Sequence, residues 1–330
     1  MTRLVRSAGP CAAIAVVALV AGCSRRSESP AVPAAHESAS AREPASARES
    51  ASARAPASAA APALPTPAGA TACGDHGCIQ FDSPEAALRY VLETKPLVLA
   101  IGEAHAQKGK EGVDSSAKRF TDLLPMLKGS ASDLVLELMM PNNQCKKKTE
   151  QVREKQKVVT SKQADTNQNE YVKMGERSRQ VGIIPDLLRP ACEDLDAIDK
   201  AGEDSIPVFL STIARLTRVQ VEKLLDRNGK TPADAGKMVV TYGGVLHNDL
   251  EPPKALSDWS FGPQLSERVG KRYVELDMFV PEFIENTDTW RKLEWFPHYD
   301  RDRMGSKTTM FRPRPGSFVL IFPMSKPASP

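Results

Sequence analysis

Residues 97–101 read LVLAI, five apolar residues in a row, and Gly102-Glu103-Ala104-His105 follows them directly. A short, continuously apolar run is typical of a strand that is buried on both faces of a parallel sheet. A second run, residues 237–242 (KMVVTY), is followed by Gly243-Gly244-Val245-Leu246-His247. The two segments predict buried strands that each end in a glycine followed, three residues later, by a histidine.

Apolar runs alternate with amphipathic stretches along the rest of the chain, which predicts an α/β fold with a parallel sheet flanked by helices. Helices are expected at residues 84–94, 116–127 and 206–226, and the first has Ser83 as its N-cap and Pro84 at its first position. The helix at 116–127 separates strands at 97–101 and 133–138, so a parallel βαβ unit is expected there. Further strands are expected at residues 181–184, 272–279 and 317–322.

Two segments differ from this pattern. Residues 144–180 are rich in Lys, Gln and Glu with few apolar positions, which predicts a solvent-exposed helical insertion. Its run Lys146-Lys147-Lys148 is interpreted as a solvated face, with a patch for lipid headgroups as the alternative. Residues 286–315 are rich in Trp, Pro and Arg and are expected to be irregular.

Polar side chains gather at the predicted strand ends. In open α/β sheets ligands bind beyond the carboxyl ends of the strands. Glu103 and His105 follow one strand, Glu137 lies near the end of another (LVLEL), and His247 follows a third. A buried carboxylate such as Glu137 is costly unless it is paired. These four residues are the predicted catalytic site.

Two chemistries fit such a site. His105, His247 and Glu103 could ligate a divalent transition metal such as Mn, Co or Zn, whose bound water would be the nucleophile. Alternatively, His105 acts as a general base that Glu103 or Glu137 orients. The alternative without chemistry is that one histidine belongs to the core and the glutamates pair with arginines.

Further candidates carry weaker signals. Arg189 is a candidate for binding an anionic substrate group, or for an ion pair with Glu137. Tyr242 is a candidate for stabilising a developing charge, or a core residue. Asp249 follows His247 closely and could orient it, and His298 lies in an aromatic segment that could form a lid.

Several function classes lack their residues in this sequence. There is no HExxH, GxSxG, P-loop or GxGxxG motif, which argues against the common metalloproteases, serine hydrolases and nucleotide-binding proteins. Basic and acidic residues nearly balance beyond the first 70 residues, so nucleic acid is not an expected partner. A small molecule or a peptide is the expected ligand.

The N-terminus predicts export. Arg3 and Arg6 precede a short uncharged run, as in a secretory signal over residues 1–22. The sequence LVAGC that ends at Cys23 resembles the lipobox of bacterial lipoproteins, so Cys23 is the predicted lipidation site and the protein's anchor in a membrane. Ser24 follows where some inner-membrane proteins have Asp, which favours the outer membrane. An ordinary signal with an incidental cysteine is the alternative.

A tether is expected to follow the anchor. Residues 23–70 consist almost entirely of Ala, Ser, Pro, Arg and Glu and contain the repeat SAREPA, SARESA, SARAPA. Such a segment has little to bury and cannot offset the entropy of ordering, so it is predicted to be disordered. A repeat that binds another protein is the alternative. Residues 71–330 are long enough for one α/β domain.

Four cysteines remain in this domain: Cys73, Cys78, Cys145 and Cys192. An even number in an exported protein predicts disulfides. Of the three possible pairings we favour Cys73–Cys78 with Cys145–Cys192. The alternative for the first pair is a metal site formed by Cys73, His76 and Cys78.

The motifs IGEAH (residues 101–105), ELMMP (137–141) and YGGVLH (242–247) together resemble a superfamily that includes erythromycin esterase, the haem-binding lipoprotein ChaN and the TIKI/TraB proteins. The resemblance spans roughly residues 85–279. It implies a parallel α/β sheet with helical insertions and a common pocket lined by Glu103, His105, Glu137 and His247. Function varies among the branches: metal-dependent peptidase, lactone hydrolase or haem binder.

The leading hypothesis is therefore a membrane-anchored, hydrolase-like lipoprotein that acts on an ester or peptide bond, with or without a metal. A lipoprotein that binds haem or a metal without catalysis is the competing hypothesis. A third is a binding or structural module that has lost its chemistry.

Overall fold

The computed structural model describes residues 66–325. The predicted signal, Cys23 and almost all of the predicted tether lie outside the described residues. The strands are β1 (Thr71–Gly74), β2 (Cys78–Phe81), β3 (Val98–Glu103), β4 (Ala131–Met139), β5 (Ile184–Leu188), β6 (Met238–Gly244), β7 (Tyr273–Phe279), β8 (Thr308–Arg314) and β9 (Ser317–Ile321). The α-helices are α1 (Pro84–Leu92), α2 (Ser116–Leu123), α3 (Lys146–Val159), α4 (Asn167–Gln180), α5 (Cys192–Lys200), α6 (Ser205–Lys230), α7 (Gly262–Val269), α8 (Asp288–Arg291) and α9 (Arg301–Met304).

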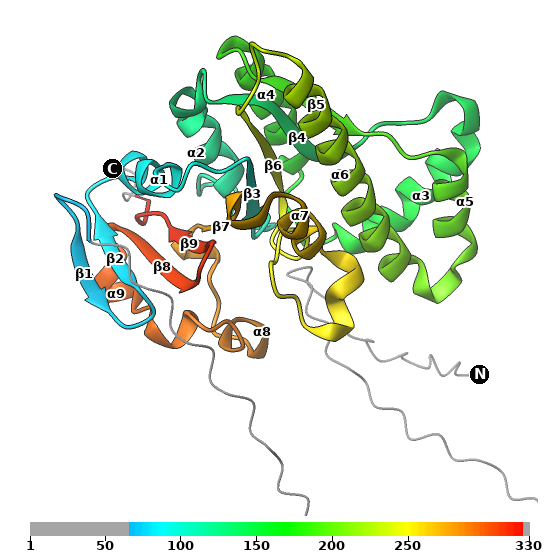
Figure 1. Ribbon diagram of the computed structural model, residues 1–330. Coiled ribbons are helices and arrows are strands. Elements are labelled where there is room, and N and C mark those ends of the chain that lie inside the picture. The colour runs from blue at the N-terminus through cyan, green and yellow to red at the C-terminus, as the bar shows by residue number, and fades with distance from the viewer. Residues whose placement is uncertain (1–65, 326–330) are drawn as a thin grey trace, which may run out of the picture.

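All the strands belong to one nine-stranded sheet in the order β1-β2-β8-β9-β7-β3-β6-β4-β5 (Figure 1). The strands from β9 to β5 run parallel, whereas β8, β2 and β1 extend the sheet in antiparallel fashion. The predicted α/β fold is confirmed. β3 and β4 are parallel as expected, but β6 lies between them and pairs with both.

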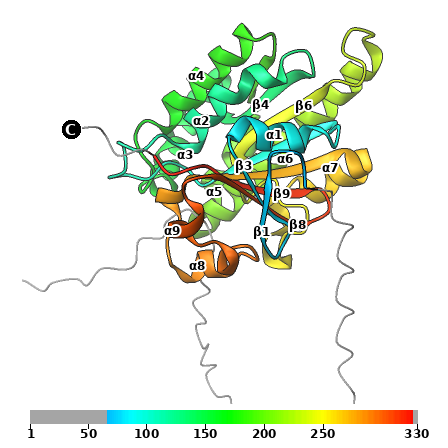
Figure 2. The same cartoon turned by 90° about the vertical axis from the view of Figure 1, so that its left-hand side faces the viewer.

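Helices cover both faces of the sheet because its central strands are apolar on both sides. Leu99 and Ile101 of β3 face a core that includes residues of α1, α2 and α4. Val98 and Ala100 face a second core that includes residues of α5, α6 and α7. Such double-sided burial explains the continuous apolar runs in the sequence. Figure 2 shows α2 and α4 side by side, in agreement with their contacts.

The segment predicted to be a solvent-exposed insertion is helical but only partly exposed. It forms α3 and α4, and α4 packs against β4 and β5. Tyr171 and Met174, three residues apart on α4, are buried in the core. The predicted helical insertion is confirmed, but α4 is exposed on only one side, because one narrow apolar stripe is enough to dock an otherwise polar helix.

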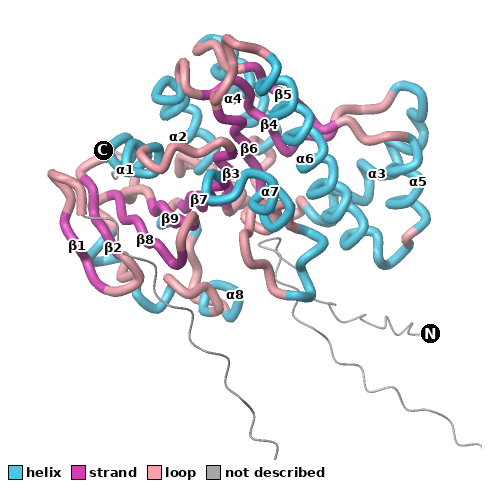
Figure 3. The backbone as a smooth tube through the Cα atoms, in the orientation of Figure 1, coloured by secondary structure: helices cyan, strands magenta, loops and turns pink. Residues whose placement is uncertain are grey.

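The other boundary corrections concern short strands. Residues 181–184 are not a strand: Val181 is the C-cap of α4, Gly182 has a positive φ of 86°, and β5 begins at Ile184. Residues 286–315 are mostly loop and short helices, as Figure 3 shows, but they also contain β8. The irregular assignment was wrong for β8, whose Pro313 and arginines hid a strand that pairs with β2 and β9.

Both predicted disulfides are present. Cys73–Cys78 joins the neighbouring strands β1 and β2, so neither thiol is available for the alternative metal site with His76. Cys145–Cys192 joins the N-terminal ends of α3 and α5. Among residues 66–325, no helix has the length and apolar character needed to cross a membrane.

Candidate functional site

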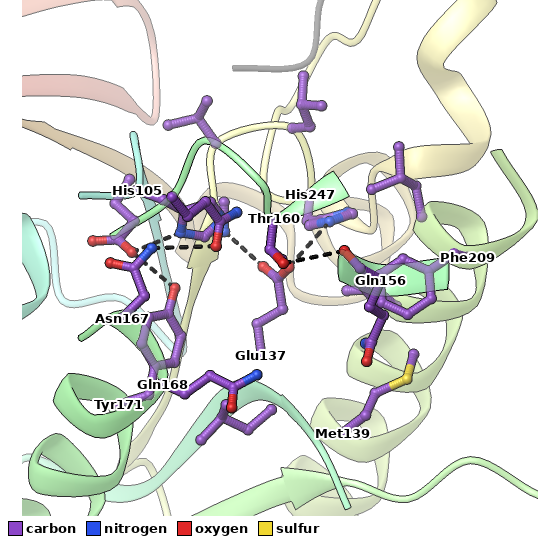
Figure 4. A pocket seen from close by; sticks show the side chains of 18 of the residues that line it. His105, Glu137, Met139, Gln156, Thr160, Asn167, Gln168, Tyr171, Phe209 and His247 are labelled. Atoms are coloured by element: carbon purple, nitrogen blue, oxygen red, sulfur yellow. Dashed lines mark hydrogen bonds and ion pairs between the residues drawn. The ribbon is translucent and has the colours of Figure 1, made fainter. Parts of the chain in front are cut away.

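The four predicted catalytic residues line one cavity. β6 pairs with β3 on one side and β4 on the other, so the ends of these three strands meet at one edge of the sheet. A cavity of about 350 Å³ opens there, and Glu103, His105, Glu137 and His247 are all in its lining (Figure 4). The hypothesis of one site requires these four residues, which are distant in the sequence, to lie in the same cavity, and they do.

Glu103 holds His105 by its Nδ1 atom. Oε1 of Glu103 lies 2.9 Å from Nδ1 of His105. A carboxylate can only accept a hydrogen bond, so Nδ1 carries the proton and Nε2 is the free nitrogen of the neutral ring. Glu103 is 2% exposed and also accepts from the hydroxyls of Tyr171 at 2.9 Å and Tyr242 at 2.6 Å. Three donors thus fix the carboxylate that orients the imidazole.

The environment makes His105 more basic than an ordinary histidine. Burial by itself would lower the pKa of His105. The hydrogen bond and charge of Glu103, together with the charge of Glu137, outweigh burial and raise this pKa above 6.5. His105 is therefore suited to accept a proton near neutral pH.

Glu137 lies between the two histidines. Its Oε2 accepts a hydrogen bond from the backbone N–H of Gly244 at 2.6 Å, and its Oε1 lies 3.6 Å from Nε2 of His247. Burial would raise the pKa of this carboxyl, but His247, His105 and the Gly244 N–H together lower it to about 2. Glu137 is therefore a fixed negative charge and not a proton donor at neutral pH.

His247 is anchored by its own backbone environment. Its Nδ1 lies 2.6 Å from the carbonyl oxygen of Trp259, so Nδ1 donates and Nε2 is directed to Glu137. The proposed role of Asp249 in orienting this ring was wrong. Asp249 lies within ion-pair distance of Arg314 instead, at 3.8 Å.

The glycines at the carboxyl end of β6 allow this close approach. A Cβ on Gly243 would clash with Oε2 of Glu137, and a Cβ on Gly244 would lie 3.3 Å from Nε2 of His105 and 3.8 Å from Oε2 of Glu137. Neither glycine has a positive φ. Their lack of a side chain, and not their backbone freedom, is what the site requires.

The remaining predicted residues lie outside the lining of this cavity. Tyr242 is 1% exposed and lies behind Glu103, outside the cavity lining, so it positions Glu103. Arg189 is exposed and absent from the lining, and Glu137 takes other partners. His298 is also absent from the lining, and its ring lies 4.1 Å from that of His76 between centroids. The structure therefore places Arg189, Tyr242 and His298 outside the lining of this cavity, and their substrate-binding and lid roles stay predictions.

Sequence reasoning missed the walls of the cavity. Tyr171 comes from the predicted insertion, and α3 and α6 supply further lining residues. The signal for Tyr171 was present, since Tyr171 and Met174 form an apolar pair at helical spacing within a polar segment.

The predicted metal ligands are committed to other partners. Both carboxylate oxygens of Glu103 accept hydrogen bonds, and Nδ1 of His105 is used by Glu103. Within residues 66–325, no group of three or more His, Cys, Asp and Glu side chains is arranged to hold a metal ion. A metal bound by Glu103, His105 and His247 stays a prediction, in which Nε2 of His105 and Nε2 of His247 would be the nitrogen ligands.

The fold and the site together define a class, an α/β protein with buried Glu–His pairs in a cavity at the carboxyl edge of a parallel sheet. Comparison with known proteins places the chain no further: no family model, no curated protein and no solved structure matches it. The resemblance to the erythromycin esterase, ChaN and TIKI/TraB superfamily remains a prediction based on its short motifs.

Proposed function

We propose that this protein hydrolyses an ester or peptide bond, with His105 as the general base. The observation that carries the proposal is the position of His105: Glu103 holds Nδ1 at 2.9 Å, and the ring lines a 350 Å³ cavity beside Glu137. A base held from behind by a carboxylate, with its free nitrogen in a cleft, is the arrangement that proton abstraction needs.

Water is the nucleophile in this proposal. A side-chain nucleophile would be a hydroxyl or a thiol. Among the described residues, the cavity lining has the hydroxyls of Thr160 and Tyr171 and no cysteine. Tyr171 donates to Glu103, and Thr160 donates to the carbonyl oxygen of Gln156. His105 Nε2 takes a proton from water as the water oxygen bonds to the carbonyl carbon, and the charge of Glu137 stabilises the imidazolium that forms.

His247 is the proposed acid. With Nδ1 donating to Trp259, a second proton on Nε2 makes an imidazolium that faces Glu137. The imidazolium gives this proton to the leaving oxygen or nitrogen as the bond between that atom and the carbonyl carbon breaks. The two histidines thus supply a base and an acid on either side of one fixed carboxylate. After the products leave, His105 releases its proton to solvent and His247 takes one up, which restores the starting protonation states.

The test is release of 4-nitrophenol from 4-nitrophenyl esters, and of amines from a fluorogenic peptide mixture, by purified residues 66–330. His105→Gln should lower kcat/KM by about 10²- to 10⁴-fold, the usual contribution of a general base. His298→Gln, which changes a histidine outside the cavity, is the matched control and should leave the rate unchanged. Equal rates for the protein and for His105→Gln would refute the proposal.

Non-catalytic metal or haem binding is the rival function, because the Nε2 atoms of His105 and His247 are potential ligands on the same cavity. Two measurements separate it from hydrolysis. Metal analysis of the untagged protein would find stoichiometric Mn, Co or Zn that His105→Ala loses, and titration with haemin would give a Soret band. Either signal without ester or peptide hydrolysis would favour the rival.

We also propose that the hydrolase is exported and anchored by lipid on Cys23. The formation of both disulfides by the four cysteines of the described domain supports an oxidising compartment. Labelled palmitate should enter the full-length chain and not Cys23→Ala, and membrane fractionation would then assign the inner or outer membrane. A soluble full-length protein without label would contradict the anchor.

A further inference from the structure

One wall of the cavity is cationic. The face of α3 that lines the cavity carries Arg153, Gln156, Lys157 and Thr160, at the spacing i, i+3, i+4 and i+7 that places side chains on one side of a helix. All four are polar, and two of them are cations. Within the described residues, this lining contains one arginine, Arg153, and one lysine, Lys157. Apart from the histidines, the positive charge of the lining is therefore confined to α3.

The cations of this wall are available to a ligand. Arg153 is exposed, and its guanidinium has no hydrogen bond or ion pair within residues 66–325. Lys157 pairs with Glu154 at 2.6 Å, but both side chains are about two-thirds exposed. An exposed pair of this kind contributes little and is easily exchanged for another anion. Neither cation therefore has a strong partner within the protein.

A second wall of the cavity is apolar. Phe209, Leu210 and Ile213 of α6 line it, at the spacing i, i+1 and i+4. The carboxyl end of β4 adds Leu138 and Met139 to the same cavity, and the turn after β6 adds Leu246. A ligand that fills the space beside these residues gains from burying apolar surface.

The third wall is the acid–base edge, and its charge is negative. Glu137 is ionised at neutral pH, since its pKa is lowered to about 2. An anionic ligand group would be repelled at this edge and attracted to α3. The cavity thus distinguishes three parts of a ligand: a reacting bond, an apolar body and an anionic end.

We infer that the ligand of this cavity is an anionic amphiphile, an ester or amide with an apolar chain against α6 and a carboxylate or similar anion on Arg153 and Lys157 of α3. The inference names the substrate class of the proposed hydrolase and rests on that function only for the reacting bond. A guanidinium binds a carboxylate through two parallel hydrogen bonds, so Arg153 is the specificity-determining residue.

Binding can be tested without catalysis. Dansyl-undecanoic acid and N-undecyldansylamide share an apolar body and differ in the anion, neither has an ester or carboxamide bond to hydrolyse, and their fluorescence reports binding. The acid should bind about tenfold more tightly than the uncharged amide, as one charge-assisted contact predicts. Arg153→Gln/Lys157→Gln should remove this preference, whereas Arg89→Gln, an exposed arginine on α1 outside the cavity, should keep it. Equal binding of both probes, binding of neither, or a preference that survives the double variant would overturn the inference.

A second pair of probes separates this inference from the proposed function. Mono-4-nitrophenyl suberate and 4-nitrophenyl octanoate have equal chain lengths, and only the first has a terminal carboxylate. Arg153→Gln should raise KM for the suberate about tenfold and leave kcat, and both constants for the octanoate, unchanged. Selective binding of dansyl-undecanoate without hydrolysis of either ester would refute the hydrolase and still support an anionic amphiphile as the ligand of the cavity. Hydrolysis of both esters with equal KM would refute the substrate class alone.

Discussion

The hydroxyl of Tyr171 donates to Oε1 of Glu103 at 2.9 Å, and the same oxygen faces Nδ1 of His105. Tyr171 belongs to α4, and Glu103 ends β3. The helical segment between β4 and β5 therefore does more than cover the cavity, because it holds the carboxylate that orients the proposed base. Docking of α4 and orientation of His105 are physically coupled.

Tyr171→Phe tests this coupling. The variant removes one of the donors to a buried carboxylate, and a buried group that loses a partner costs about 1–3 kcal/mol of stability. We expect the free energy of unfolding to fall by about that amount and kcat for ester hydrolysis to fall more than KM changes. Tyr299→Phe is the control, since the buried hydroxyl of Tyr299 has no hydrogen-bond partner within the described residues. If both variants behave alike, Tyr171 has no positioning role.

The pH dependence of hydrolysis tests the base. His105 must be unprotonated to accept a proton, and its pKa is raised above 6.5 mainly by Glu103 against the opposing effect of burial. We therefore expect kcat/KM to rise with pH through an apparent pKa above 6.5. In Glu103→Gln the charge is lost while burial remains, so the rising limb should move to lower pH and the plateau should fall. A limb that stays in place would show that another group titrates.

Gly243→Ala tests the close approach between β6 and Glu137. A Cβ at this position clashes with Oε2 of Glu137, so the carboxylate must move away from Gly244 and His247. We expect at least a tenfold loss of kcat, with the helical circular dichroism retained. Gly229→Ala in α6 is the matched control, because a Cβ there meets nothing within 4 Å and alanine favours a helix. Full activity of Gly243→Ala would show that the placement of Glu137 is unimportant.

The sequence was sufficient to predict the central strands and the site, for one physical reason. Strands buried on both faces must be apolar throughout, so LVLAI and KMVVTY stand out, and polar residues that follow such strands must lie at the sheet edge. Glu103, His105, Glu137 and His247 were found in this way. Their convergence follows from β6 pairing with both β3 and β4.

The rest depends on contacts that local patterns do not encode. β1, β2 and β8 are antiparallel strands at one side of the sheet, and their short polar sequences become strands through pairing. The ion pair between Asp249 and Arg314 depends on which segments come together in space. The cationic and apolar walls of the cavity arise from α3 and α6, which are separated by α4, β5 and α5 along the chain, so their combined composition could not be predicted from any one segment.

A buried acid away from the cavity gives a prediction about stability. Asp277 of β7 accepts a hydrogen bond from Nδ2 of Asn248 at 2.9 Å, next to the loop that carries His247. Burial, and to a lesser degree the charge of Asp249, raises the pKa of Asp277 to about 7 from 3.8, while Asn248 and Arg314 oppose the shift. The folded protein therefore holds a proton that the unfolded chain releases between these two pH values.

Stability contributed by this proton is present below pH 3.8, the value of the unfolded chain, and is lost as pH rises towards 7. The Asp277→Asn side chain cannot ionise and keeps an oxygen that accepts from Asn248. The variant should therefore not lose this stability as the pH rises. We expect the variant and the unmodified protein to differ little in stability at pH 4. At pH 7 the variant should be more stable, by at most about 4 kcal/mol, since each unit of pKa shift is equivalent to about 1.4 kcal/mol.

Urea unfolding of both proteins at pH 4, 5.5 and 7 measures this difference. Asp258→Asn, an exposed carboxylate on the loop between β6 and α7, is the control and should show no dependence on pH relative to the unmodified protein. A destabilised Asp277→Asn at pH 7 would mean that the charge itself is needed, as an anchor for Arg314 or for the His247 loop. Asn248 directly follows His247 and donates to Asp277, so the same variant should retain hydrolysis at pH 7 if the hydrogen bond, and not the charge, holds that loop in place.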